Sequence, residues 1–292
     1  MSLQKSGQEE GTDPKVSVVV PVYNRRDLTI SFLRNFEHVT YQNCEIVIVD
    51  DGSTDGTSEV IAREFPHVRL LRESGDLWWT KATNIGVRDA LAHGANYILT
   101  INDDVDVDPN FLSALVTYAR SHPLTLIGSF IYDLSHPSHL WYAGGKIGWV
   151  RGDLIHRSSL RDGTLAWLTG MGTLIPAEVF RRVGFYDEEN FPQYTADADL
   201  SMRARKDGFS LAVEPSSVIW NKTEESAHVV QRRIVTWRTF FAPLFTMKSA
   251  YYLKMRVALY KRHWPPVLFP VALAAFFLRF IRKQMTRLLK IR

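Results

Sequence analysis

A cluster of oxygen-bearing side chains, Asn102-Asp103-Asp104-Val105-Asp106, directly follows an apolar run in this chain. Such oxygens suit Mg²⁺ or Mn²⁺, which usually take one or two protein carboxylates and leave room for water and phosphate oxygens. The alternative is a solvated acidic turn that caps the helix expected from about Asn110. The cluster by itself does not decide between these two interpretations.

A second acidic loop, Asp50-Asp51-Gly52-Ser53-Thr54-Asp55, follows an earlier apolar run. Ser53 or Asp55 is expected to cap the next helix, but capping uses one oxygen and leaves the first two carboxylates unexplained. The first apolar run ends in Pro21-Val22-Tyr23-Asn24, which adds an aromatic ring and an amide. Together the three segments predict a nucleotide site with a bound cation.

The elements that must position these loops alternate between strand and helix. β-Branched runs predict strands at Val16–Val22, Glu45–Val49, Val68–Leu71 and Tyr97–Ile101, and apolar residues at helical spacing predict helices at Arg26–Phe36 and Thr57–Phe65. This rhythm indicates an α/β chain with a doubly wound sheet. Ligands of such sheets bind at the carboxyl ends of the strands, where the acidic loops lie.

The pattern is less regular beyond Asp108. A helix is expected from Asn110 to Arg120, followed by a region rich in Gly, Trp and Tyr without clear alternation up to Leu168. Helices are expected again at Ala177–Val183 and Asp199–Lys206, and short strands at Ser210–Val213 and Val218–Trp220.

The C-terminal tail differs in charge from the rest of the chain. Beyond Glu225 there are fourteen Lys and Arg but no Asp or Glu, although the whole chain carries only +4. The aromatic and aliphatic content favours an anionic membrane surface over nucleic acid as the partner of this tail. Self-association through its apolar face is the alternative, so an oligomer stays open.

We expect two tail helices from Ala227 onward, broken at Trp264-Pro265-Pro266, because consecutive prolines stop one helix and fit the start of the next. The apolar stretch Val267–Leu278 is too short for a transmembrane span, so an amphipathic anchor in the plane of the membrane is expected. The chain has one cysteine, Cys44, which excludes an internal disulfide, and Met1–Asp13 lacks the apolar core of a signal peptide. These features predict a cytoplasmic protein on the inner face of the membrane.

The ordered motifs resemble glycosyltransferase family 2. The resemblance rests on Val18-Val19-Val20-Pro21-Val22-Tyr23-Asn24, the Asp-Asp-Gly-Ser turn and the Asn-Asp-Asp cluster, and it extends over about residues 15–225. Further blocks follow in the family's order: Lys81-Ala82-Thr83-Asn84-Ile85-Gly86, Gly170-Met171-Gly172-Thr173-Leu174, Gly184-Phe185-Tyr186-Asp187-Glu188 and Thr195-Ala196-Asp197-Ala198-Asp199-Leu200. Bacterial surface-polysaccharide enzymes such as rhamnosyltransferases carry similar blocks.

This resemblance implies the GT-A fold, in which a Rossmann-like mixed sheet that binds a nucleotide sugar is flanked by helices. It divides the chain into a flexible lead-in (1–14), a catalytic domain (15–226) and a basic, membrane-proximal helical tail (227–292). Within the catalytic domain, residues 15–108 would form the nucleotide-binding half and 109–226 the acceptor half.

The resemblance also implies roles for single residues. Asp51 would hydrogen-bond the base of a UDP- or dTDP-sugar, and Asn102-Asp103-Asp104 would occupy the family's DXD position, with Asp104 in direct contact with the metal. The residues expected to bind the nucleotide sugar are Pro21, Tyr23, Asn24, Asp51, Trp79, Lys81, Asn84, Asn102, Asp103 and Asp104. Trp79 belongs here because the turn Gly75–Trp79 adjoins Lys81–Asn84, which resembles a donor-side loop.

Asp197 matches the position of the catalytic base that removes the proton of the acceptor hydroxyl. Its alternative is a helix N-cap. Trp78, Gly172 and Asp199 are expected near the acceptor or behind the site. Where many relatives carry a His after the strand that ends at Trp220, this chain has Asn221. Asn221 and Lys222 are candidate contacts for the diphosphate, and His228 is an alternative.

The predicted activity is therefore an inverting, metal-dependent sugar transfer to a glycan or lipid-linked glycan. A nucleotidyltransferase of similar architecture is a second hypothesis, although it needs a Gly-rich loop after the first strand and residues 22–26 contain no glycine. The third is a non-catalytic nucleotide- or glycan-binding protein, since Ala196, Asn102 and Asn221 depart from common family patterns.

Overall fold

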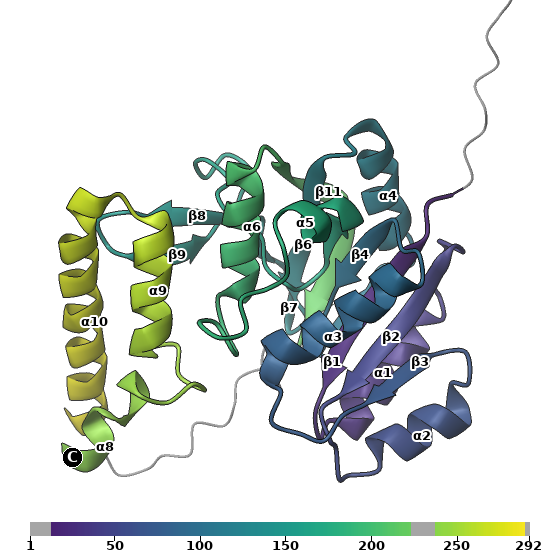
Figure 1. Ribbon diagram of the computed structural model, residues 1–292, viewed down its shortest axis with the longest axis horizontal. Coiled ribbons are helices and arrows are strands. Elements are labelled where there is room, and N and C mark those ends of the chain that lie inside the picture. The colour runs from purple at the N-terminus through teal and green to yellow at the C-terminus, as the bar shows by residue number, and fades with distance from the viewer. Residues whose placement is uncertain (1–12, 223–236, 290–292) are drawn as a thin grey trace, which may run out of the picture.

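The computed structural model describes residues 13–222 and 237–289, arranged as a curled mixed sheet with helices on both faces and a helical extension at one end (Figure 1). The described strands of the main sheet follow the order β3-β2-β1-β4-β10-β6-β11-β5, with β7 paired to β6. The expected 1–14 lead-in and the start of the tail lie largely outside the described residues.

The first half of the sheet is parallel and matches the predicted pattern closely. It contains β1 (Val16–Val22), β2 (Cys44–Asp50), β3 (Arg69–Arg72) and β4 (Tyr97–Thr100). Four of the β1 valines have no exposed surface, because a strand covered on both faces buries every side chain. The chain runs from β1 outward to β3 and then crosses to β4 on the other side of β1, which places a topological switch point between β1 and β4.

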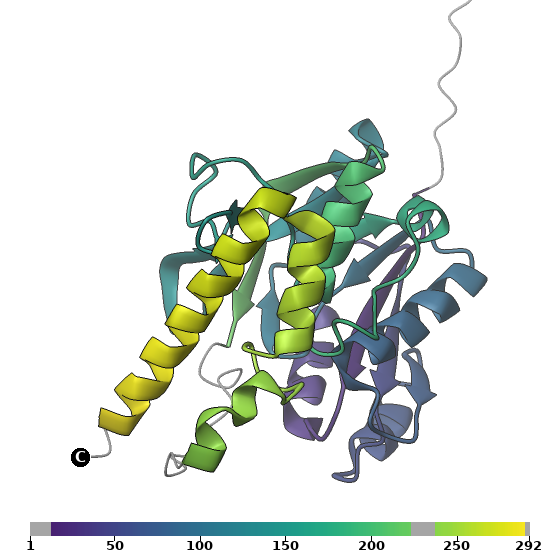
Figure 2. The ribbon, with the colours of Figure 1, turned by 60° about the vertical axis from the view of Figure 1, so that its left-hand side comes forward.

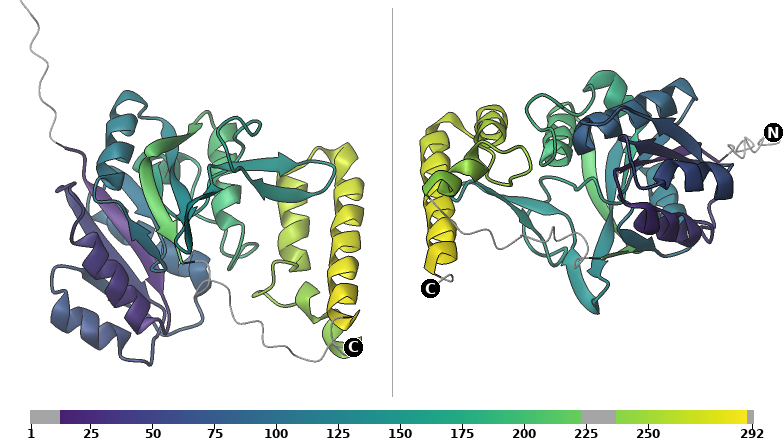
Figure 3. Two further views of the ribbon diagram at one scale, coloured as in Figure 1. Left: turned by 180° about the vertical axis from the view of Figure 1, so that it is seen from behind. Right: turned by 90° about the horizontal axis from the view of Figure 1, so that it is seen from below.

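Helices cover the two faces according to the direction of these crossovers (Figures 1 and 3). Helices α1 (Arg26–Phe36), α2 (Thr57–Glu64) and α4 (Phe111–Ser121) lie on one face, and α3 (Trp78–Ala92) lies on the other. Helices α1, α2 and α4 confirm the predictions to within one or two residues at each end.

Helix α3 corrects the sequence analysis, which read Gly75–Trp79 as a turn and Lys81–Asn84 as a loop. Both tryptophans and Lys81 belong to the helix. Gly86 brings this helix close to the sheet: a Cβ there would lie 2.5 Å from Cγ1 of Val19. The strand–helix contact therefore requires glycine, and its low helix propensity weakened the helical signal.

The second half of the sheet is mixed. It contains β5 (Val105–Val107), β6 (Thr125–Asp133), β7 (His136–Tyr142), β10 (Thr173–Pro176) and β11 (Ser210–Asn221), and a separate hairpin is formed by β8 (Gly145–Gly148) and β9 (Asp153–His156). The two short strands predicted at 210–220 are one strand with an irregularity between Glu214 and Val218. Helices α5 (Ala177–Arg182) and α6 (Ala196–Lys206) confirm the two helices predicted there.

The C-terminal extension consists of α8 (Trp237–Phe240), η1 (Ala242–Leu244), α9 (Leu253–His263), η2 (Pro266–Leu268) and α10 (Phe269–Leu289). The break at Trp264-Pro265-Pro266 is confirmed. Figures 1 and 2 show α9 and α10 side by side, with α9 nearer to α6. Across the described ranges, no helix combines the length and apolar character that crossing a membrane requires.

Candidate active site

A cavity of about 270 Å³ opens beyond the carboxyl ends of β1 and β2. We call it the first cavity. Its lining includes five of the predicted site residues together with two cationic residues: Pro21, Tyr23, Asp51, Trp78, Trp79, Arg25 and Lys248. The sheet topology places a ligand site here, at the switch point beside β1.

Asp51 is fixed by the backbone of the turn that starts α3. Its Oδ1 accepts a hydrogen bond from the Leu77 N–H at 3.0 Å, and its Oδ2 accepts from the Trp78 N–H at 3.1 Å. Burial raises the pKa of this carboxyl, while the two backbone donors oppose the shift. Gly52 allows the close approach of the two loops, because a Cβ there would lie 2.8 Å from the Gly75 nitrogen.

The Asn-Asp-Asp cluster follows β4 and meets Arg25, which precedes α1. The guanidinium lies 3.1 Å from Oδ1 of Asp103 and 3.0 Å from Oδ2 of Asp104. Asp103 has no exposed surface, and its Oδ2 accepts a hydrogen bond from the Thr29 hydroxyl at 2.9 Å. Burial raises the pKa of Asp103 to about 6, although Arg25 lowers it.

A second cavity of about 170 Å³ contains Asp197, the predicted base. The carboxylate accepts hydrogen bonds of 2.8 Å from the backbone N–H groups of Gly170 and Ala198. Burial raises its pKa in spite of these donors. Thr195, two residues before Asp197, has φ +75°, a conformation that non-glycine residues adopt mainly where function or packing demands it.

Trp79 forms a wall common to both cavities. Its indole N–H donates to Oδ1 of Asn102 at 3.1 Å, and its ring packs edge-on against Tyr186 at 5.6 Å between centroids. Asn102 also lines the second cavity. The structure therefore brings Asn102, at the end of β4, and the base candidate Asp197 into one cavity beside this indole.

Seven predicted residues line neither cavity: Asp103 and Asp104, described above, Asn24, Lys81, Asn84, Gly172 and Asp199. Asn24 has φ +50° and accepts from the Thr54 N–H at 2.8 Å, which joins the loops after β1 and β2. Lys81 is exposed. Asn84 is buried and donates to the Tyr186 carbonyl at 2.9 Å, and Gly172, at φ +73°, accepts from the Ser129 N–H. Their assignment to substrate binding stays a prediction.

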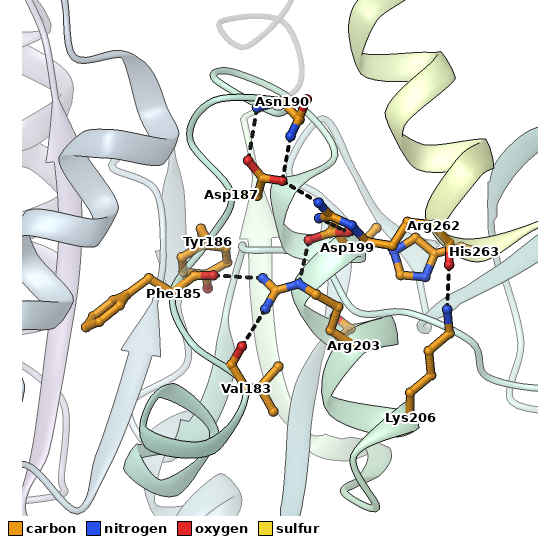
Figure 4. Close-up of polar contacts among 12 residues, drawn as sticks. Val183, Phe185, Tyr186, Asp187, Asn190, Asp199, Arg203, Lys206, Arg262 and His263 are labelled. Atoms are coloured by element: carbon orange, nitrogen blue, oxygen red, sulfur yellow. Dashed lines mark hydrogen bonds and ion pairs between the residues drawn. The ribbon is translucent and has the colours of Figure 1, made fainter.

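Asp199, also outside the two cavities, is the centre of an ion-pair cluster (Figure 4). The fully buried carboxylate accepts from Arg203 at 2.8 Å, from Arg262 at 2.9 Å and from His263 at 2.8 Å. Burial alone would raise the pKa of Asp199, but the hydrogen bond from His263 and the two guanidinium groups outweigh this effect. The pKa is therefore lowered from its usual value. Since Arg262 and His263 end α9, this cluster ties the extension to the helix that carries Asp197.

Sequence reasoning missed two cationic residues at the first cavity. Arg25 follows the Tyr23-Asn24 motif without a signal of its own, and Lys248 comes from the extension, with its ammonium 4.8 Å from the centre of the Trp78 ring. The candidate contact Lys222 forms an ion pair with Asp106 at 3.0 Å, and Asn221 is buried at the end of β11. His228 lies outside the described residues.

The donor set fits a divalent cation that is only partly held by protein. Among the described residues, no three His, Cys, Asp or Glu side chains gather closely enough to hold a metal by themselves. Asp103 and Asp104 supply two adjacent carboxylates, which is the usual number for Mg²⁺ when phosphate and water complete the shell. The residues present therefore suit a cation that arrives with a diphosphate.

Solved structures similar to this chain support the fold. A mannosyltransferase from Pyrobaculum calidifontis, in complex with GDP-Man and Mn²⁺, matches with a TM-score of 0.61 and 17% identity over 94% of this chain and 74% of its own. Residues 1–349 of TarS from S. aureus match with a TM-score of 0.56 and 14% identity, covering 94% of this chain and 83% of that one. The GT-A fold predicted from the sequence is confirmed.

Proteins of similar sequence indicate which family the chain belongs to. A Streptococcus pneumoniae glycosyltransferase, GlyG, is 28% identical over 187 residues, 60% of this chain and 61% of the relative, so this chain spans under two thirds of that protein. The Mycobacterium tuberculosis N-acetylglucosaminyl-diphospho-decaprenol L-rhamnosyltransferase is 26% identical over 69% of this chain and 74% of its own length. The family model for glycosyl transferase family 2 matches residues 17–184, more than half of the sequence, and the chain therefore belongs to that family.

Proposed function

We propose that this protein transfers a sugar from a nucleoside diphosphate donor to a hydroxyl group of a glycan, with inversion at the anomeric carbon. The observation that carries the proposal is the placement of Asp197: a carboxylate of raised pKa faces a cavity that shares Trp79 with the cavity at the switch point. Donor and acceptor would meet at this indole.

Asp197 would act as the general base. The backbone N–H groups of Gly170 and Ala198 hold its carboxylate in one orientation, and its raised pKa brings the proton affinity closer to that of a base working near neutral pH. Removing the acceptor proton as the hydroxyl attacks from the face opposite the leaving group gives direct displacement, and hence inversion. A base in this role typically contributes about 10²- to 10⁴-fold to the rate.

The nucleotide would occupy the first cavity. Asp51 retains lone pairs beside those used by the Leu77 and Trp78 N–H groups, so it can accept from the N3–H of uracil or thymine. We therefore favour UDP or dTDP as the carrier. The exposed Tyr23 ring and the Trp78 ring supply flat apolar surface for the base.

Asp104, with Asp103 beside it, would hold Mg²⁺ or Mn²⁺. When bound there with the donor, the cation would act as a Lewis acid that neutralises charge on the leaving diphosphate. Asn102 would serve as a neutral acceptor in the position where family members commonly have a carboxylate.

We also propose that the extension holds the enzyme on the inner, cytoplasmic face of a membrane, near a lipid-linked acceptor. Four apolar side chains recur along the outward face of α10, with exposed fractions of 45–68%: Val271, Leu278, Ile281 and Met285. The opposite face of the helix is buried, so this stripe has no partner among the described residues. Because the basic tail contains no carboxylate beyond Glu225, an anionic lipid surface complements it better than a second copy would.

A nucleotide screen tests the central proposal. Calorimetry with UDP, dTDP, GDP and CDP, each with and without Mn²⁺, should give binding by UDP or dTDP that strengthens with the metal. Turnover of the matching sugar nucleotide should then release nucleoside diphosphate. Release of pyrophosphate would instead indicate a nucleotidyltransferase, and no binding of any nucleotide would support the non-catalytic alternative.

Vesicle sedimentation tests the membrane proposal separately. The double variant Leu278→Gln/Ile281→Gln should lose binding to vesicles that contain phosphatidylglycerol, because it removes apolar contacts from the outward stripe. Leu124→Gln/Leu160→Gln changes two leucines of 48% and 47% exposure outside the extension and should bind as the unmodified protein does. Equal sedimentation of both variants would contradict the assignment of this face.

A further inference from the structure

Arg25 occupies an unusual place for a basic side chain in a site that is expected to bind a cation. Its two terminal nitrogens lie about 3 Å from carboxylate oxygens of two consecutive residues, 3.1 Å from Asp103 and 3.0 Å from Asp104. Asp104 is only 4% exposed, and Asp103 is fully buried. A guanidinium fork placed in this way neutralises charge where a divalent cation would otherwise do so.

Both aspartates are held by contacts other than Arg25, Asp103 through its carboxylate and Asp104 through its backbone carbonyl. Asp103 is held from the other side by the Thr29 hydroxyl, and the carbonyl of Asp104 accepts from the Lys222 N–H at 3.0 Å. The Arg25 side chain, in contrast, is 31% exposed and lines the first cavity. It can therefore turn toward a ligand in that cavity while the carboxylates stay in place.

The charges show why such a movement would matter. Arg25, Asp103 and Asp104 together carry −1 when all are ionised, and the two carboxylates alone would carry −2. A divalent cation that approached Asp104 with the guanidinium still in place would meet a like charge at close range, which weakens its binding. A diphosphate offers the guanidinium an alternative anion of suitable geometry, because arginine binds phosphate oxygens with two parallel N–H donors.

We propose that Arg25 couples cation binding to donor binding: without a nucleotide its guanidinium holds the carboxylates of Asp103 and Asp104, and the donor diphosphate draws it away so that the cation can bind. This inference rests on the proposed function, since it assigns the diphosphate to the first cavity. Its consequence is that Mn²⁺ and the nucleotide bind cooperatively, and that the size of this cooperativity depends on the charge at position 25.

The test is a comparison of Mn²⁺ binding in the absence and presence of UDP, by calorimetry or by the electron paramagnetic resonance of free Mn²⁺. Unmodified protein should bind Mn²⁺ weakly alone and roughly 5- to 150-fold more tightly with UDP, the usual range of coupling between two ligands. Arg25→Gln should bind Mn²⁺ alone at least about tenfold more tightly, and UDP should then add less. Arg26→Gln is the matched control, because that neighbouring side chain pairs with exposed Asp27.

Arg25→Lys provides a variant that keeps the charge but cannot bridge two carboxylates, and its Mn²⁺ affinity should lie between those of the other two proteins. Circular dichroism establishes that each variant is folded before titration. Unchanged or weaker binding of Mn²⁺ alone by Arg25→Gln would overturn the inference. Failure of UDP or any other nucleotide to bind the unmodified protein would overturn the proposed function instead, and the titration with Mn²⁺ alone keeps the two results distinct.

Discussion

The loops at the carboxyl ends of the parallel strands and the helical extension reach the first cavity by different routes. Tyr23 and Asp51 are there because they follow β1 and β2 directly. Lys248 is there because α9 is tied to α6 by contacts that span 63 and 64 positions of sequence, from Arg262 and His263 to Asp199. The positions of Tyr23 and Asp51 follow from local sequence, whereas the position of Lys248 depends on tertiary contacts.

This difference separates the expected effects of substitution. Changes at the strand ends and at Asp197 should lower donor binding or the rate of sugar transfer, while the protein stays folded. Changes in the Asp199 cluster should reduce stability first and affect the site only through the docked extension.

The largest effect is expected from Asp197→Asn. Loss of the base should lower turnover of the donor and acceptor by about 10²- to 10⁴-fold, while donor affinity changes little. Steady-state kinetics and calorimetry with the donor nucleotide measure the two quantities. Asp207→Asn, at the other end of α6, should leave both unchanged.

The pH dependence of turnover and of stability provides a second test of the role of Asp197. Because the raised pKa of Asp197 favours its protonated form in the folded protein, turnover should fall as the pH is lowered through a value above the usual 3.8. For stability the sign is opposite: the contribution of this group is present below pH 3.8 and is lost as the pH rises through its folded pKa. Asp197→Asn should therefore be no less stable than the unmodified protein at pH 7, and a large loss of stability would indicate a structural role.

The next effect concerns Asp199→Asn. This change removes the buried carboxylate that accepts from Arg203, Arg262 and His263, and breaking a buried ion pair by removing one partner costs about 3–5 kcal/mol in the free energy of unfolding. Asp187→Asn removes a single, more exposed partner of Arg262 and should cost at most about 1 kcal/mol. Urea unfolding of both variants measures the difference, and equal losses would contradict the central role of Asp199.

Gly86→Ala tests the packing of α3 on β1. A Cβ at 2.5 Å from Val19 overpacks this contact, which typically costs about 1–3 kcal/mol of stability. Val19→Ala removes the atom that clashes, so the double variant should be destabilised by less than the sum of the two single changes. Additive losses in urea unfolding would show that the contact adapts in another way.

Elements specified by local sequence could be predicted, whereas those that depend on tertiary contacts could not. Strand β1 and helix α1 were predicted residue for residue, because unbroken β-branched runs and helical spacing leave little choice there. Helix α3 was read as a turn and loop, since its two tryptophans and its glycine suggest a binding segment more strongly than a helix. The short strands of the mixed half have no period that separates them from turns.

Among the residues of the site, only some could be placed from the sequence. Asp51 and Asn102 could be placed by the strands that precede them, and Asp197 by its motif. Asp199 and Lys248 could not, because their partners come from elements that only tertiary structure brings together. A buried carboxylate within a motif looks the same in sequence whether it faces a substrate or, like Asp199, two arginines and a histidine.

The smallest effect is expected at Lys248, which the extension brings to the loops that line the first cavity. Lys248→Met removes a cation that lines the first cavity beside Trp78, and a partly exposed ion pair of this cation with the donor diphosphate would contribute up to about 1 kcal/mol, which corresponds to at most a roughly fivefold loss of donor affinity. Lys254→Met, which alters an exposed pair with Glu189, should leave that affinity unchanged. If docking of the extension is what places Lys248, Asp199→Asn should weaken donor binding to the same extent at a temperature where it is still folded. Adding Lys248→Met to that variant should then weaken binding no further, whereas a further twofold loss would mean that Lys248 reaches the cavity independently of the Asp199 cluster.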